Sequence, residues 1–201
     1  MRAFVSIAAF LLVGLLIPQT GFAQESVGKA IVDGKTVTLY SDNTWKYVTV
    51  SGEAGCVQVT VKLSFCGDLQ RWRPSPTANA IISAAYSLNA STYGQYIVED
   101  IGTSNGISAE FMRGAIIQVA GAQSDREPVV LGLETGTFQD AEIETVIFQV
   151  LIKGLPVVFA TSLYLTSGTT AQITTYELGQ TYSDAHKAAH TEFLAATRIE
   201  G

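Results

Sequence analysis

The stretch that decides the fold spans residues 143–178 and reads IETVIFQVLIKGLPVVFATSLYLTSGTTAQITTYEL. Its β-branched and aromatic residues predict three consecutive strands, at residues 143–152, 155–165 and 170–178. Lys153-Gly154 separates the first two, and Thr166-Ser167-Gly168-Thr169 separates the last two. Because connections this short join only antiparallel strands, the stretch predicts an antiparallel sheet.

Two segments outside this stretch have helical spacing. The first is residues 108–122, whose apolar side chains recur on one face at Phe111, Ala115, Ile116, Val119 and Ala122. The second lies near the C-terminus, with Thr181 and Ser183 as candidate N-caps and an apolar stripe at Tyr182, Ala185, Ala189, Phe193 and Ala196. Runs of strands with segregated helices predict an α+β fold. We expect an antiparallel sheet packed with two main helices, one after Ser104 and one at the C-terminus.

The N-terminal part of the chain predicts a separate β-meander. Residues 29–32, 36–40 and 44–50 have strand composition, and the turns between them are Asp33-Gly34 and Asp42-Asn43. The small, polar residues 51–55 then read as a linker. The predicted organisation is a signal peptide at 1–23, the meander at 24–50, the linker at 51–55 and an α+β sandwich domain at 56–201.

The first residues have the pattern of a secretory signal peptide. Arg2 supplies the positive charge, residues 4–18 are almost wholly apolar, and the small Ala23 precedes Gln24. We therefore expect cleavage near Ala23 and a periplasmic or secreted protein. The apolar run is shorter than the roughly 20 residues a membrane anchor needs, and no later segment has that length.

The charge balance excludes two classes of partner. Loss of Arg2 from the 12 basic residues leaves 11 against 18 acidic residues, a net charge of −7 for the mature chain. An acidic chain lacks the positive surface that nucleic acids require. It also lacks the basic clusters that bind anionic membranes.

The two cysteines, Cys56 and Cys66, raise conflicting expectations. An oxidising compartment favours a disulfide between them. The intervening residues of CVQVTVKLSFC, however, alternate strictly between apolar and polar, which predicts one continuous strand. The ends of such a strand lie roughly 33 Å apart, whereas a disulfide needs its Cα atoms within about 7 Å. Both possibilities stay open from sequence alone.

The two histidines are separated by one helical turn. His186 and His190 share a face of the predicted C-terminal helix, which is a spacing that can contribute two ligands to a metal. Lys187 replaces the glutamate of the H-E-x-x-H pattern, so the general base of a zinc protease is missing. We expect both histidines to be helix residues at the edge of the buried face, and we predict no metal.

A serine-hydrolase interpretation rests on Gly102-Thr103-Ser104-Asn105-Gly106, which matches G-x-S-x-G by letter. This composition is also that of an ordinary turn, and the predicted antiparallel topology is not that of an α/β-hydrolase. The chain has no glycine-rich loop with P-loop spacing, and we predict no cofactor. The acidic pair Glu99-Asp100 and the cluster Asp140, Glu142 and Glu144 are expected to lie solvated at turn edges.

Aromatic residues are the remaining candidates for binding. Trp72, Tyr86, Tyr93 and Tyr96 could line an aromatic cleft, although we expect most of them to be core or rim residues. Trp45 follows the second turn of the meander, and we expect it, with Leu39, to anchor the meander on the main domain more than to contact a ligand.

Three segments carry a resemblance to a known fold family. The strand VKLSF at residues 61–65 is followed by Trp72, a β-hairpin occupies residues 154–176, and a closing helix ends in EFL at residues 192–194. In this order they resemble the Mog1/PsbP-like α/β/α sandwich domains of exported bacterial proteins. Cys66-Gly67 stands where the family usually has a proline before the tryptophan loop. The resemblance implies a binding or assembly role and carries over no site residue.

Residues 33–48, DGKTVTLYSDNTWKYV, have a separate likeness. They are similar to a short V-x-L-x-x-D-G-T-W-x-Y hairpin found near the N-terminus of exported bacterial proteins, with Asn43 in place of the glycine.

The function expected from the sequence is an exported, non-catalytic module that binds an envelope or secreted protein or assists its assembly. It would act through a sheet face or a groove beside a helix. The alternative is a small-molecule or lipid-binding domain with a pocket between sheet and helix. A serine hydrolase using Ser104 is a third hypothesis.

Overall fold

The computed structural model describes residues 26–32, 35–47 and 55–200. The predicted signal peptide and most of the predicted linker lie outside the described residues, as do residues 48–50 at the end of the third meander strand.

The main sheet has seven strands, all joined to their neighbours in antiparallel fashion. Across the sheet their order is β6 (Arg73–Ser75), β7 (Ala84–Ser87), β8 (Thr92–Glu99), β12 (Thr170–Leu178), β11 (Leu155–Leu165), β10 (Ala141–Ile152) and β9 (Val129–Phe138). The three strands predicted from residues 143–178 therefore lie side by side near the middle, as expected. Residues 73–75, which follow the buried Trp72, form the edge strand β6.

Tight turns set the register of the central strands. Lys153 and Gly154 have φ of 51° and 76°, and together they form the two-residue turn between β10 and β11. Positive φ at both central residues gives a twist that matches the flanking strands. Gln139 and Asp140 make a turn of the same kind between β9 and β10, with φ of 47° and 63°. The Lys153-Gly154 turn places Phe148 opposite Phe159.

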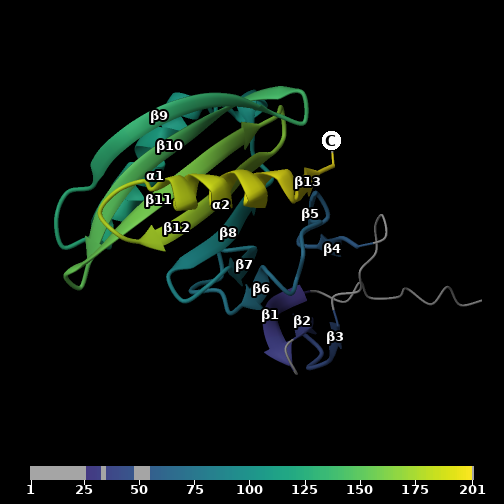
Figure 1. The fold of residues 1–201 in the computed structure, drawn as a ribbon. Coiled ribbons are helices and arrows are strands. Elements are labelled where there is room, and N and C mark those ends of the chain that lie inside the picture. The colour runs from purple at the N-terminus through teal and green to yellow at the C-terminus, as the bar shows by residue number, and fades with distance from the viewer. Residues whose placement is uncertain (1–25, 33–34, 48–54, 201) are drawn as a thin grey trace, which may run out of the picture.

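One helix packs on each face of the sheet (Figure 1). Helix α1 (Ala109–Ala122) contacts β10 and β11, and its N-terminus is capped by Ser108, whose Oγ accepts a hydrogen bond from the Phe111 amide. Helix α2 (Asp184–Ala195) covers β8 and β12 on the other face. Ser183 caps α2 by accepting from the His186 amide at 3.0 Å, so the second candidate cap is the one used. No helix among the described residues is long and apolar enough to cross a bilayer.

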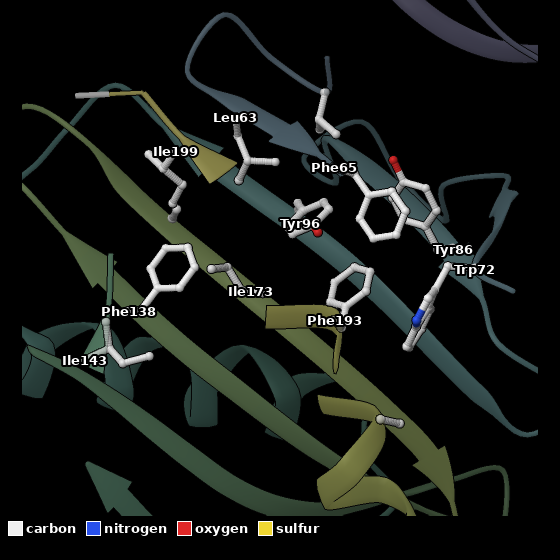
Figure 2. Close-up of a cluster of buried hydrophobic side chains, with 13 residues drawn as sticks. Leu63, Phe65, Trp72, Tyr86, Tyr96, Phe138, Ile143, Ile173, Phe193 and Ile199 are labelled. Carbon is white, nitrogen blue, oxygen red and sulfur yellow. The ribbon is translucent and has the colours of Figure 1, made fainter. Parts of the chain in front are cut away.

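The larger core lies between α2 and the sheet (Figure 2). Phe193 of α2 stands at its centre, within ring-contact distance of four aromatic side chains: Phe65, Trp72, Tyr86 and Tyr96. Gly94 of β8 makes room for this ring, because a Cβ at that position would collide with the Phe193 ring. The helix can therefore settle closely on the sheet.

Cys56 and Cys66 form a disulfide, and the predicted continuous strand between them is wrong. The segment folds back as a hairpin of β4 (Val57–Gln58) and β5 (Leu63–Phe65), which brings the two Cα atoms to 4.0 Å. The turn contains no Gly, Pro or Asn. The Val59 and Thr60 amides both donate to the Leu63 carbonyl and close it, and within the turn the Thr60 hydroxyl accepts from the Lys62 amide at 3.1 Å.

Two small sheets complete the structure. Strand β13 (Thr197–Ile199), which the sequence did not predict, pairs with β5 in a sheet of order β13-β5-β4. The predicted meander consists of β1 (Ser26–Val32), β2 (Lys35–Tyr40) and β3 (Trp45–Tyr47), and these strands form a three-stranded sheet of their own. The described part of the chain is α+β, with antiparallel sheets, two α-helices and a strand-rich N-terminal region.

Candidate functional site

Four aromatic rings form a ladder across the α1 side of the main sheet. Antiparallel register places Phe148 opposite Phe159, Phe159 opposite Tyr176, and Tyr176 opposite Tyr93 on four neighbouring strands. Neighbouring ring centroids lie 5.2, 5.2 and 5.1 Å apart, and each pair is stacked. Stacked cross-strand aromatic pairs stabilise a sheet and present flat, rigid ring surfaces.

Helix α1 covers only one end of this ladder. Its residues Ile116, Ile117 and Ala120 pack over the cluster that includes Phe148, which is 2 % exposed. The other three ladder residues are half-buried. The main strand contacts of α1 are with β10 and β11, whereas Tyr176 and Tyr93 lie on β12 and β8. The ladder thus emerges from beneath the helix onto the surface.

Two leucines extend this surface. Leu155 pairs with Ile152 and Leu178 pairs with Val157, and both partners belong to the cluster under α1, so the two leucines lie on the same face. They are 58 % and 49 % exposed. We call the combined surface of Tyr93, Leu155, Phe159, Tyr176 and Leu178 the α1-side strip.

The α1-side strip is apolar and uncharged at neutral pH. Burial raises the pKa of Tyr176, and the neighbouring Tyr93 raises it further, so its hydroxyl stays protonated. The Tyr93 hydroxyl donates to the Ala90 carbonyl at 3.0 Å, which holds that ring in place. An uncharged strip of rigid aromatic and aliphatic side chains suits burial against another apolar surface.

The aromatic residues predicted for binding separate into three groups. Tyr93 lies in the α1-side strip. Trp72 and Tyr96 are 0 % exposed, so they are core residues and the prediction that they contact a ligand is wrong. Their polar atoms are used inside the protein: the Trp72 indole donates to Glu192 at 3.1 Å, and the Tyr96 hydroxyl lies 2.7 Å from Thr197 Oγ1. Trp45 is 47 % exposed on β3 opposite Leu39, and its anchoring role stays a prediction.

The two histidines lie in a buried polar network under α2. Thr175 Oγ1 is 3.0 Å from His186 Nε2 and 2.9 Å from His190 Nδ1. His190 Nε2 is 2.8 Å from Ser162 Oγ, which in turn is 2.6 Å from Thr145 Oγ1. We call these five residues the histidine network. His186 Nε2 and both ring nitrogens of His190 face hydroxyls. No group of three His, Cys, Asp or Glu side chains suited to a metal occurs among the described residues.

Burial keeps both histidines neutral. It lowers the pKa of His190 to about 4, and the neighbouring His186 adds to that shift. Burial also lowers the pKa of His186, although the Glu177 carboxylate, 3.8 Å from Nδ1, acts in the opposite direction. His186 Nδ1 is buried without a hydrogen-bond partner.

Ser162 and His190 have the separation of a nucleophile and its base. Ser162 is 0 % exposed beneath the helix, however, so a substrate cannot reach it. Sequence reasoning did not find this pair, because the two residues lie on different elements.

Ser104, the serine singled out from the sequence, lies elsewhere. It belongs to the short 3-10 helix η1 (Thr103–Asn105), and the His190 ring contacts Ser162 and Thr175. The glycine before it has a structural role. A Cβ at Gly102 would collide with the Thr166 carbonyl oxygen, and the Thr103 amide donates to that same oxygen at 2.8 Å.

The space between α2 and the sheet, where a ligand pocket was the alternative expectation, is filled by packed rings. Phe65 and Tyr86 have centroids 4.4 Å apart, and Tyr96 stacks on Phe193 at 4.8 Å. A groove of about 330 Å³ lies elsewhere, between β1 and the segment before β7, with Val27, Val59 and Ile82 among its lining residues.

Comparison with known proteins assigns a fold. No protein-family model matches the chain, and no curated protein matches it. The solution structure of cyanobacterial PsbP (CyanoP) from Synechocystis sp. PCC 6803 superposes with a TM-score of 0.52 at 11 % identity, over 76 % of this chain and 99 % of that one. This chain therefore has a PsbP-like fold, as its sequence resemblance implied.

A second solved structure is more distant. It is the protein of unknown function PA94 from Pseudomonas aeruginosa, described as a putative regulator. It has a TM-score of 0.38 at 7 % identity, over 77 % of this chain and 88 % of that one.

Proposed function

We propose that this chain is an exported, non-catalytic binding module that docks a segment of another envelope or secreted protein on the α1-side strip. The observation that carries the proposal is the aromatic ladder, which begins in the core under α1 and ends half-buried on β12 and β8. Contiguous exposed apolar surface is a mark of protein interaction sites. Rigid aromatic residues are also favoured there, since they lose little conformational entropy on binding.

Three further features support the proposal. The two leucines beside the ladder are about half exposed, so a partner could bury them fully. The disulfide fits an oxidising compartment, and with the leader-like first residues it favours export. The chain's Ser–His pair is sealed in the core, and the PsbP-like fold by itself carries no chemistry.

Paired lysine substitutions test the binding site. Leu155→Lys with Leu178→Lys places charge in the α1-side strip at positions that are already half-exposed, so folding should be little affected. The matched control is Val61→Lys, which is 78 % exposed at the tip of the β4–β5 hairpin. Chemical cross-linking in an envelope extract should yield the same partner with the wild type and the control, and should lose it with the double variant. If the wild type, the control and the double variant all cross-link the partner equally, the α1-side strip is not the binding site.

Export and the absence of catalysis are tested separately. The intact mass of the protein purified from the envelope should correspond to a chain beginning at Gln24, and a denatured sample should contain no free thiol. A serine-reactive fluorophosphonate probe should label neither the wild type nor Ser104→Ala. Labelling of the wild type that disappears in Ser104→Ala would establish a hydrolase instead.

A further inference from the structure

Strand β9 forms a long, exposed edge of the main sheet. It pairs with β10 on one side, and no described strand pairs with its other side. An edge strand turns a row of unpaired N–H and C=O groups outward, which another strand can satisfy. Nine of the ten residues of β9 are exposed or half-buried, and only Phe138 is buried.

This edge has few of the features that normally block strand addition. Its sequence, VVLGLETGTF, contains no Lys, Arg or Pro. Val129, Val130, Leu131 and Leu133 are 45, 53, 42 and 50 % exposed. Glu134 is its one charged residue, and this carboxylate is held over the α2 side by Lys187 at 2.8 Å.

The available pairing surface is the C-terminal part of the strand. The register with β10 shifts between Ile147 and Phe148, where Leu131 is the extra residue of a bulge. From Gly132 to Phe138 the pairing with β10 is regular. The main-chain N–H and C=O groups on the outer side of this segment therefore alternate as they do in a regular strand. This regular segment is long enough to hold an added strand of ordinary length.

Charge at the two ends of β9 distinguishes between possible occupants. Glu127 precedes the strand, while Asp140 and Glu142 follow it, and all three are exposed. Within the described part of the chain, none of the three takes part in an ion pair. A second copy of this chain paired in parallel would bring each of these acids beside its own counterpart. Paired antiparallel, it would bring Glu127 beside the other copy's acidic end, while the neighbouring Arg126 is held by Gln149 Oε1 at 2.7 Å.

We propose that β9 accepts an extended segment of another protein as an added strand, and that this segment has an apolar middle flanked by Lys or Arg at both ends. Main-chain hydrogen bonds would supply affinity, Leu133 and its neighbours would bury alternate side chains, and the terminal acids would select basic flanks. The α1-side strip reaches from β11 to β8 and does not include β9. The two sites can therefore be tested independently.

The probe is a labelled peptide as long as β9, with alternating valine and threonine between lysine pairs. A second peptide has glutamate in place of lysine. Fluorescence anisotropy at low salt should show binding of the lysine peptide, with the glutamate peptide at least about tenfold weaker, since several exposed charge pairs are exchanged for repulsions. Hydrogen exchange should slow at the β9 amides when the lysine peptide is bound.

Protein variants complete the test. The affinity for the lysine peptide should fall roughly tenfold in Leu133→Lys, and also in the double variant Glu127→Lys with Glu142→Lys. Val61→Lys and the Leu155→Lys, Leu178→Lys pair should leave its binding unchanged. The proposal is overturned if the lysine peptide fails to bind, if the glutamate peptide binds equally well, or if exchange slows elsewhere. It is also overturned if sedimentation shows a wild-type dimer that Leu133→Lys dissociates, because β9 would then pair with a second copy.

Discussion

Lowering the pH from 7.5 to 4.5 should destabilise this protein through the histidine network. His190 is 5 % exposed, and burial lowers its pKa to about 4 from the value of 6.5 in an unfolded chain. Between these two values the unfolded state binds a proton that the folded state does not. Stability is therefore full above pH 6.5 and is lost as the pH falls toward 4.

The magnitude follows from the pKa difference. At pH 4.5 unfolded His190 is almost fully protonated and folded His190 is still mostly neutral, so the free energy of unfolding should fall by about 2.5 kcal/mol. His186, whose pKa is also lowered, adds to this loss. Glu192 does not contribute within this window. Its pKa is lowered by the hydrogen bond from Arg71, so the stability that it supplies is lost only below its unfolded value of 4.5.

Urea unfolding followed by tryptophan fluorescence measures the effect, because Trp72 is 0 % exposed and will report on opening of the core. The control is His190→Gln, whose amide can still hydrogen-bond but does not titrate. This variant will be less stable than the wild type at every pH. Between pH 7.5 and 4.5, however, the fall in its free energy of unfolding should be smaller than the fall in the wild type by about 2.5 kcal/mol. The reasoning is refuted if the wild type loses under about 1 kcal/mol, or if the variant's stability depends on pH as steeply as the wild type's.

Three further outcomes are expected in the same urea assay. Replacing both Cys56 and Cys66 by serine should lower the free energy of unfolding by about 3 kcal/mol, and dithiothreitol should do the same to the wild type, because the closed loop no longer restricts the unfolded chain. Gly94→Ala should cost about 1 to 3 kcal/mol, because its methyl group would overlap the Phe193 ring. Gly114→Ala, in α1 with open space around the new methyl group, should instead stabilise by about 0.5 to 1 kcal/mol.

Part of the candidate site could have been predicted from the sequence. A two-residue turn at Lys153-Gly154 places Phe148 and Phe159 at equal distances from it, and hence opposite each other. The next turn places Tyr176 opposite Phe159 in the same way. Three rings of the ladder were therefore available from turn positions alone. The fourth, Tyr93, joins through pairing of β8 with β12, which are far apart in the chain, and local spacing carries no information about that pairing.

The wrong predictions have two different physical causes. Trp72 and Tyr96 were proposed as binding residues because an aromatic side chain looks the same from sequence whether it faces a cleft or a core. Their burial depends on Phe193, which comes from the far end of the chain. The hairpin between Cys56 and Cys66 was missed because its turn lacks the glycine, proline or asparagine that usually marks one.

The amino-acid sequence by itself determined the α+β class, the antiparallel central strands, both helices and the resemblance to PsbP-like domains. These depend on hydrophobic periodicity and short turns, which act over a few residues. Only the tertiary structure decided that the disulfide forms, that the histidines are enclosed with Ser162 and Thr175, and that β9 is left at an edge. Those features arise where elements distant in sequence meet, and their geometry is set by packing of the whole sheet and its helices.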